Sequence, residues 1–217
     1  VGQTAVATLT KNMGITSDVP AVPSICLGSF DASVYDMVGA YSVFVNHGVW
    51  TEPIYLLRIA DKNGNVIYER RPRVKVVLDE QTAYIMTDML KAVVQEGTGV
   101  RLGWKYKLTN PIGGKTGTTQ NNSDGWFMGI TPELVTGVWT GAEDRAIHFS
   151  TTSFGEGANT ALPIFAIYMQ KVYADPALKY SKGDFPPPKG GITTVIDCAE
   201  YSKQQSGVSE LDKKLGF

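Results

Sequence analysis

Apolar residues recur at intervals of three and four in four stretches of the chain, a spacing typical of helices with one buried face. The first stretch covers 4–12, and Gly14 is placed to end it. The second follows Ser33 and Asp36, which are spaced as in a capping box, and it continues to Gly48. The pattern therefore predicts two helices ahead of Gly48.

Two further helices are predicted later in the chain. One follows Asp79 and stops at Gly97, where glycine favours a helix end. The other opens with Thr160 and Pro163, because proline is tolerated in the first turn of a helix. The side of this last helix that we expect to be buried consists of Leu162, Phe165, Ala166, Met169, Val172 and Tyr173.

A small hairpin is predicted over 54–70. The runs 54–60 and 66–70 have strand character, and the Asn63-Gly64 pair between them favours a tight turn. We expect this hairpin to form a peripheral lobe.

Three short extended segments follow between 111 and 141. Turn-forming residues at 120–123 and 131–133 separate them, so the pattern predicts an antiparallel meander. Helices packed on such a sheet make an α+β fold the expected class.

The character of the chain changes after Asp175. The run Phe185-Pro186-Pro187-Pro188, followed by two glycines, indicates the exit from a domain. We therefore divide the chain into a domain portion over 1–175 and an exit segment with a tail over 176–217. Residues 192–196 are predicted to form one further strand before the polar tail.

Composition narrows the class of protein. The 217 residues are 43% hydrophobic and 19% charged, which fits a globular domain or a piece of one. No apolar run is long enough to span a membrane, and the start of the chain has no signal-peptide pattern. The formal net charge is -1, without a stripe of Lys and Arg on a predicted helix, which argues against a nucleic-acid partner.

The cysteines Cys26 and Cys198 are far apart and have no Cys or His beside them at metal-ligand spacing. We favour two unpaired thiols over a disulfide. We expect neither a metal nor another cofactor.

The segment from Gly113 to Thr119 reads Gly-Gly-Lys-Thr-Gly-Thr-Thr and is the part of the chain whose composition points to chemistry. Glycines let a ligand approach the backbone, while a lysine and hydroxyl groups offer donors to an anion. On a strand, Lys115 and Gly117 point to one side while Thr116 and Thr118 point to the other. Backbone N–H groups at a sheet edge would therefore have to contribute to an anion site.

Two alternative motifs fit this segment poorly. A phosphate-binding loop needs a glycine where Thr109 stands, and a helix should follow where Asn121 to Gly125 indicate a turn. The phosphorylated loop of ion-pumping ATPases also contains Lys-Thr-Gly-Thr. Its phosphate-accepting aspartate directly precedes the lysine, and that position is Gly114 in this chain.

The Lys-Thr-Gly motif of penicillin-binding proteins and serine β-lactamases fits best. The order and spacing of Lys115-Thr116-Gly117, then 124–129, then 134–141 resemble bifunctional (class A) penicillin-binding proteins. The segments 23–28, 35–41, 44–48 and 159–165 resemble them too, and the resemblance covers roughly 1–174. It implies a partial penicillin-binding transpeptidase or serine β-lactamase-like fold.

The resemblance also implies roles for individual residues. Lys115 would supply positive charge to the cleft and help relay protons, and the backbone N–H of Thr118 would be an oxyanion donor. Together with Thr116 and Gly117, these residues would bind the substrate. Gln120 is a candidate for contact with the substrate, although an ordinary turn residue is the simpler interpretation. The implied ligands are a peptidoglycan stem peptide ending in D-Ala-D-Ala, and β-lactam antibiotics in the intact domain.

The family's nucleophile is missing from this sequence. No serine has a lysine three residues later, and none has an asparagine two residues later. Thr10-Lys11-Asn12 mimics the second motif, but Gly14 follows too soon, so we interpret it as a helix end. We expect the chain to be a fragment that begins inside the transpeptidase domain and is inactive alone. The resemblance implies that the rest of this domain, a glycosyltransferase domain and a membrane anchor lie upstream.

That architecture implies a location on the outer side of the cytoplasmic membrane. The alternative is a module without a serine that binds peptidoglycan peptides non-covalently.

Five other residues invite functional interpretations. We expect Trp126 and Trp139 to belong to the core, and His47 and His148 to be structural or solvated. Asp124 could either orient Lys115 or cap the Asn-rich turn, and the sequence does not distinguish the two.

Overall fold

The computed structural model describes residues 2–197 and 200–202 as an α+β fold. Contacts group the chain into a compact unit over Val1–Pro186 and a second stretch over Pro187–Phe217. The helices and strands are α1 (Gln3–Asn12), η1 (Pro23–Leu27), α2 (Val34–Val45), β1 (Val49–Thr51), β2 (Arg58–Ala60), β3 (Val66–Glu69), β4 (Val74–Val76), α3 (Glu80–Gln95), α4 (Arg101–Trp104), β5 (Gly113–Thr118), η2 (Gln120–Asn122), β6 (Asp124–Ile130), β7 (Val135–Gly141), α5 (Thr152–Gly155) and α6 (Ala161–Ala174).

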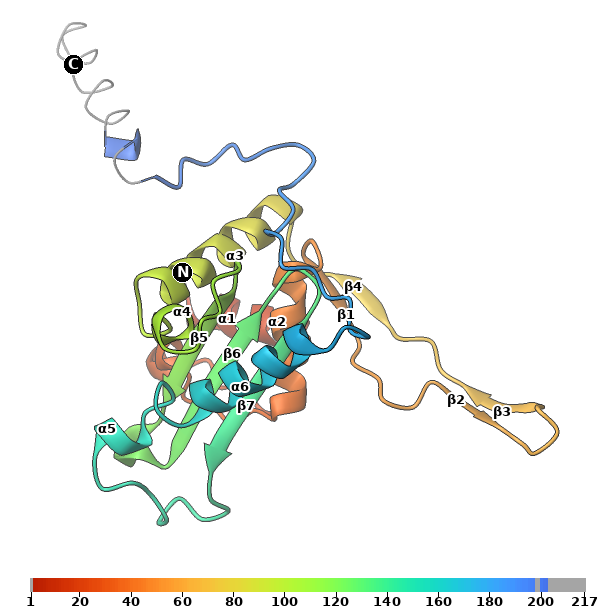
Figure 1. The fold of residues 1–217 in the computed structure, drawn as a ribbon, viewed down its shortest axis with the longest axis horizontal. Coiled ribbons are helices and arrows are strands. Elements are labelled where there is room, and N and C mark those ends of the chain that lie inside the picture. The colour runs from red at the N-terminus through yellow and green to blue at the C-terminus, as the bar shows by residue number, and fades with distance from the viewer. Residues whose placement is uncertain (1, 198–199, 203–217) are drawn as a thin grey trace, which may run out of the picture. The chain divides into compact units, whose positions relative to one another are not determined.

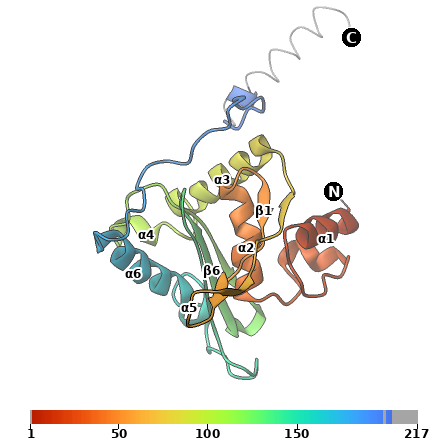
Figure 2. The ribbon, with the colours of Figure 1, turned by 90° about the vertical axis from the view of Figure 1, so that its right-hand side faces the viewer.

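The predicted meander is confirmed as an antiparallel sheet in the order β5-β6-β7. Lys115 lies opposite Met128 in the register, and Phe127 lies opposite Val138. Figure 2 shows this sheet nearly edge-on, with α6 on one face and α2 and α3 on the other.

The core lies between the sheet and these helices. Phe127 of β6 and Phe165 of α6 are almost fully buried, and their ring centroids are 4.9 Å apart. On the opposite face, Leu90 of α3 and Ile130 of β6 form a second buried cluster with Phe185. Each face of the sheet is therefore covered by apolar side chains, as the alternating pattern requires.

The four predicted helices are confirmed, and the caps explain where two of them begin. Ser33 accepts the Asp36 backbone N–H at 3.0 Å, and Asp79 accepts the Thr82 backbone N–H at 2.8 Å. The capping box itself is incomplete, because the Asp36 carboxylate accepts from the backbone and hydroxyl of Thr16 instead. This carboxylate ties the loop after α1 to the start of α2.

The predicted hairpin forms, but its strands are shorter than expected. Pairing is limited to β2 and β3, and a five-residue loop over 61–65 replaces the tight turn. The Asp61 carboxylate accepts the backbone N–H groups of Asn63 and Asn65, which stabilises the wider loop. β1 and β4 pair at the end of this hairpin that is nearer the body of the unit. We call the stretch from β1 to β4, residues 49–76, the ribbon, and Figure 1 shows it projecting from the unit.

The expected strand at 192–196 is wrong, since none of the sheets in the described residues includes it. A strand needs a neighbour for its backbone groups, and its apolar alternation alone supplies none. The predicted boundary at 175 stays a prediction, although the compact unit continues to Pro186. Cys26 is an exposed free thiol, whereas Cys198 lies outside the described residues. Within the described part of the chain, no helix is both long and apolar enough to cross a membrane.

Candidate functional site

The Lys-Thr-Gly segment forms β5, an edge strand of the three-stranded sheet. A Cβ on Gly113 would meet Leu90 of α3, whereas a Cβ on Gly114 would meet the ring of Phe127 on the α6 face. Because side chains alternate along a strand, Lys115 shares the face of Gly113 and Thr116 shares the face of Gly114. The predicted split between the lysine and the threonine hydroxyls is therefore confirmed.

The outer edge of β5 presents backbone donors. Thr119 donates its N–H to the Asp124 carbonyl at 3.1 Å, so the backbone groups of Thr119 point toward β6. In an antiparallel ladder the next residue points the opposite way, which directs the N–H groups of Thr118 and Thr116 to the open edge. Lys115 Nζ donates to the Thr116 carbonyl oxygen at 2.7 Å on this edge. An exposed ammonium group and outward N–H groups thus lie on one strand and can attract an anion.

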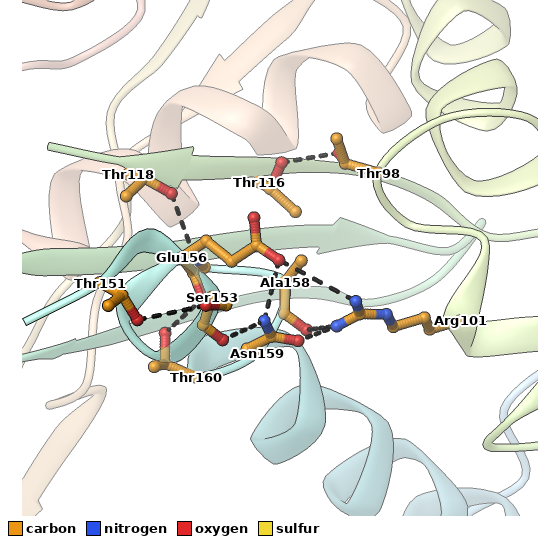
Figure 3. A network of polar contacts seen from close by, with 11 residues as sticks. Thr98, Arg101, Thr116, Thr118, Thr151, Ser153, Glu156, Ala158, Asn159 and Thr160 are labelled. Atoms are coloured by element: carbon orange, nitrogen blue, oxygen red, sulfur yellow. Dashed lines mark hydrogen bonds and ion pairs between the residues drawn. The ribbon is translucent and has the colours of Figure 1, made fainter. Parts of the chain in front are cut away.

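Both threonine hydroxyls of the strand have partners within the protein (Figure 3). Thr116 Oγ1 lies 2.7 Å from Thr98 Oγ1, and Thr118 Oγ1 accepts the Gly157 N–H at 3.1 Å. Thr118 retains its own hydroxyl proton for donation, because its oxygen is the acceptor in that bond.

Asp124 caps the turn after β5. Its carboxylate accepts from Thr119 Oγ1 at 2.8 Å, Ser123 Oγ at 2.9 Å and Trp139 Nε1 at 2.9 Å. Burial would raise the pKa of Asp124, but these hydrogen bonds and the nearby Arg145 hold the pKa below its usual value. The turn-capping interpretation is correct, whereas Lys115 is bonded to the Thr116 carbonyl instead of to Asp124.

The remaining candidates lie outside the edge of β5. Gln120 is exposed in η2, one residue beyond the bonded Thr119. Trp139 is 40% exposed, so its expected place in the core is wrong, because its indole N–H reaches Asp124 at the turn. His47 pairs with Glu80 at 3.0 Å, and His148 is an exposed loop residue.

Sequence reasoning missed the support behind the two threonines. Arg101, at the start of α4, donates to the Ala158 carbonyl at 3.3 Å and to the Asn159 side chain, and lies 3.9 Å from Glu156. The two hydrogen-bond acceptors, Ala158 and Asn159, lie 57 and 58 residues after Arg101 in the sequence, so no local motif links them to it. The only signal in the sequence was the resemblance around Asn159.

Comparison with known proteins gives a consistent match. Residues 16–143, more than half of the chain, match the family model of the penicillin binding protein transpeptidase domain. Penicillin-binding protein 1B of Vibrio cholerae is 37% identical over 212 residues, covering 97% of this chain and 25% of that protein. Penicillin-binding protein 2D of Bacillus subtilis is 34% identical, covering 86% of this chain and 26% of that protein. The chain thus spans about a quarter of the length of these relatives.

Solved structures agree on the fold. PonA1 from Mycobacterium tuberculosis has a TM-score of 0.68 at 26% identity, and 85% of this chain and 52% of that chain are covered. PonA1 in complex with penicillin V gives a TM-score of 0.67 with the same identity and coverage. Penicillin-binding protein 1A from Haemophilus influenzae has a TM-score of 0.70 over 83% of this chain and 32% of that chain, at 21% identity, which supports the fold alone.

Proposed function

Because the chain belongs to the penicillin-binding protein transpeptidase family, we propose that its strand β5 (Gly113–Thr118) forms one side of the active site of a peptidoglycan D,D-transpeptidase. We call this side the Lys-Thr-Gly wall. The observation that carries this proposal is the open edge of β5, where Lys115 stands beside outward-pointing backbone N–H groups. A stem peptide ending in D-Ala-D-Ala would lie along this edge. The intact domain would also bind β-lactams, as the PonA1 complex with penicillin V does.

The proposed chemistry divides between this chain and a nucleophile outside it. A serine hydroxyl attacks the penultimate D-alanine carbonyl, the peptide C–N bond breaks, and the last D-alanine leaves with a proton on its nitrogen. An amine of a neighbouring strand then takes the acyl group and releases the serine. The Thr118 N–H would stabilise the oxyanion, a role that in other enzymes contributes about 100-fold to 1000-fold in rate per donor.

Lys115, Thr116 and Gly117 would bind the terminal carboxylate of the substrate. The ammonium group attracts the carboxylate and can help to move protons, while the Thr116 and Thr118 hydroxyls can donate hydrogen bonds. Glycine at position 117 leaves room for the peptide to approach the backbone. Gln120, in η2 just beyond the strand, would at most contact the substrate's periphery.

The 217 residues contain no Ser-Xaa-Xaa-Lys, so this polypeptide alone should form no acyl-enzyme. The test is incubation with a fluorescent penicillin followed by denaturing electrophoresis, applied to this chain and to a longer polypeptide that supplies the serine motif. Labelling of the longer polypeptide alone is expected. A covalent band on the 217-residue chain would contradict the proposed division of the site.

Non-covalent binding by the isolated wall is the second candidate, favoured by the open edge itself. Titration with a D-alanyl-D-alanine peptide would compare the chain with its Lys115→Ala variant, using Lys62→Ala in the exposed hairpin loop as control. Equal binding by all three proteins would remove this candidate.

We also infer that the longer protein holds this wall on the outer side of the cytoplasmic membrane, where peptidoglycan is assembled. Digestion by an external protease in cells with a permeable outer surface would support this location, and full protection would contradict it.

A further inference from the structure

We propose that Arg101 is a positioning residue that sets the Thr116 and Thr118 hydroxyls by tying together the two segments that hold them. The inference rests on the proposed function for its kinetic consequence. Its geometric basis is independent of that function.

Each hydroxyl is held by a different segment. Thr98, in the turn between α3 and α4, lies 2.7 Å from the Thr116 hydroxyl, oxygen to oxygen. Gly157, in the loop between α5 and α6, donates its N–H to Thr118 Oγ1 at 3.1 Å. Figure 3 shows Thr116 beside Thr98 and Thr118 at a separate place along the strand. The two hydroxyls thus depend on two segments that are distant in sequence.

Arg101 joins these two segments. It follows Thr98 by three positions, and its neighbour Leu102 is fully buried in the core, which fixes the backbone at this point. The guanidinium then reaches across to the Ala158 carbonyl and the Asn159 side chain, directly beyond Gly157. A movement of either segment would therefore break contacts of Arg101.

The far segment is itself braced. Asn159 Nδ2 donates to Glu156 Oε1 at 2.9 Å and to the Ser153 carbonyl at 2.6 Å. Glu156 Oε1 lies 3.9 Å from the Arg101 guanidinium, and the Thr160 hydroxyl donates to the Glu156 carbonyl at 3.0 Å. Arginine offers several N–H donors in a fixed plane, so it can hold the loop at more than one point in a set geometry. Lysine has three donors on a flexible stem and lacks that fixed geometry.

The experiment measures acylation of the full-length protein by penicillin in wild type, Arg101→Ala and Arg101→Lys, with Arg58→Ala in the ribbon as control. Binding and acylation constants are separated by varying the penicillin concentration. Arg101→Ala should weaken initial binding about tenfold, the effect of losing roughly one well-placed hydrogen bond to a charged group. Arg101→Lys should lie between wild type and Arg101→Ala, and Arg58→Ala should match wild type.

A penicillin methyl ester distinguishes positioning from general damage. If Arg101 acts through hydroxyls that bind the carboxylate, the ester lacks the group that these hydroxyls recognise. The affinity for the ester in initial binding should then be nearly the same in wild type and Arg101→Ala, so that the ratio of the two affinities is close to one. An equal ratio for acid and ester would overturn the proposal. Should Arg101→Ala fail to fold, Thr98→Val removes the hydroxyl contact to Thr116 at nearly constant volume. This variant should likewise weaken binding of the penicillin acid more than binding of the ester.

Hydrogen exchange tests the geometry without requiring activity. In Arg101→Ala, the Gly157 amide should exchange about tenfold faster, while the Phe127 amide in the centre of β6 should be unchanged. Unchanged exchange at Gly157 would overturn the positioning role. A wild-type protein that is never acylated would instead contradict the proposed function, and the exchange result would still decide the role of Arg101.

Discussion

The indole N–H of Trp139 donates to Asp124 Oδ1 at 2.9 Å and joins the end of β7 to the start of β6. Asp124 is 8% exposed and also accepts from the hydroxyls of Thr119 and Ser123. One carboxylate therefore holds the turn that follows the Lys-Thr-Gly strand. The position of β5 relative to its neighbours depends on this anchor.

Replacing Asp124 with asparagine should lower the free energy of unfolding by about 2 kcal/mol, because hydrogen bonds to a buried charge are lost. The pKa of Asp124 is held below its usual value, so the stabilisation is present above the unfolded pKa of about 4 and is lost as pH falls through the folded pKa. Urea unfolding of wild type and Asp124→Asn at neutral and acid pH measures both effects.

The exposed Glu143 provides the matched control for this experiment. Glu143→Gln should change the free energy of unfolding by less than about 0.5 kcal/mol. If the two variants were equally stable at neutral pH, Asp124 would not be the anchor of the turn.

Gly157 should tolerate no side chain. A Cβ there would lie 2.3 Å from the Trp126 carbonyl oxygen and 2.5 Å from the Gly117 carbonyl oxygen, so the loop would have to lift off the sheet. We expect Gly157→Ala to destabilise the protein by about 1 to 3 kcal/mol, as overpacking commonly does. Chemical unfolding measures it, with Gly103→Ala as control, since a Cβ at Gly103 would meet nothing within 4 Å beyond its chain neighbours and its own helix backbone. Equal stabilities of these two variants would show that the loop at Gly157 can move away from the sheet without lowering the free energy of unfolding.

The sequence predicted those parts of the fold that local patterns specify. The meander was found because turn residues separate its strands, and the helices were found because caps and glycines delimit them. β1 and β4 were missed, since each has three residues and Val49 pairs with the distant Val76. Such short strands depend on their partner more than on their own pattern.

The candidate site divides in the same way. Lys115, Thr116 and Thr118 were found because they are adjacent in one motif, and the strand geometry fixed which way each points. Arg101 and Gly157 could not be found, because they reach the strand from segments that only the folded chain brings together. Trp139 was placed in the core because its alternation resembles a buried strand, whereas its side chain is 40% exposed and its N–H donates to the Asp124 carboxylate at the turn.

The base of the ribbon should loosen in acid. Hydrogen bonds from the side chain and backbone of Arg73 lower the pKa of Glu52 from 4.5 to about 2. Burial acts in the opposite direction, and the hydrogen bond and charge of Arg70 lower the pKa further. A lowered carboxylate pKa means that this contact is intact above pH 4.5 and is lost as pH falls toward 2. An NMR titration should show the ribbon amides of Ile59 and Tyr68 shifting in that window.

Glu52→Gln should remove this titration, because the remaining amide cannot ionise. The control is Glu69→Gln, which changes an exposed carboxylate on the ribbon itself. A titration that persists in Glu52→Gln would assign the acid response to another group.

Phe185 should be essential to the compact unit although it lies well beyond the end of α6. Its side chain is 5% exposed and packs with Leu90 of α3 and Ile130 of β6, while its neighbour Asp184 pairs with Lys91 at 3.0 Å. Removing a buried aromatic ring leaves a cavity, so Phe185→Ala should lower the free energy of unfolding by about 3 to 5 kcal/mol. Phe154 is 65% exposed, and Phe154→Ala should therefore cost less than about 0.5 kcal/mol. Similar losses for the two variants would mean that the segment after α6 adds nothing specific to the core, and a functional domain could then end near residue 175.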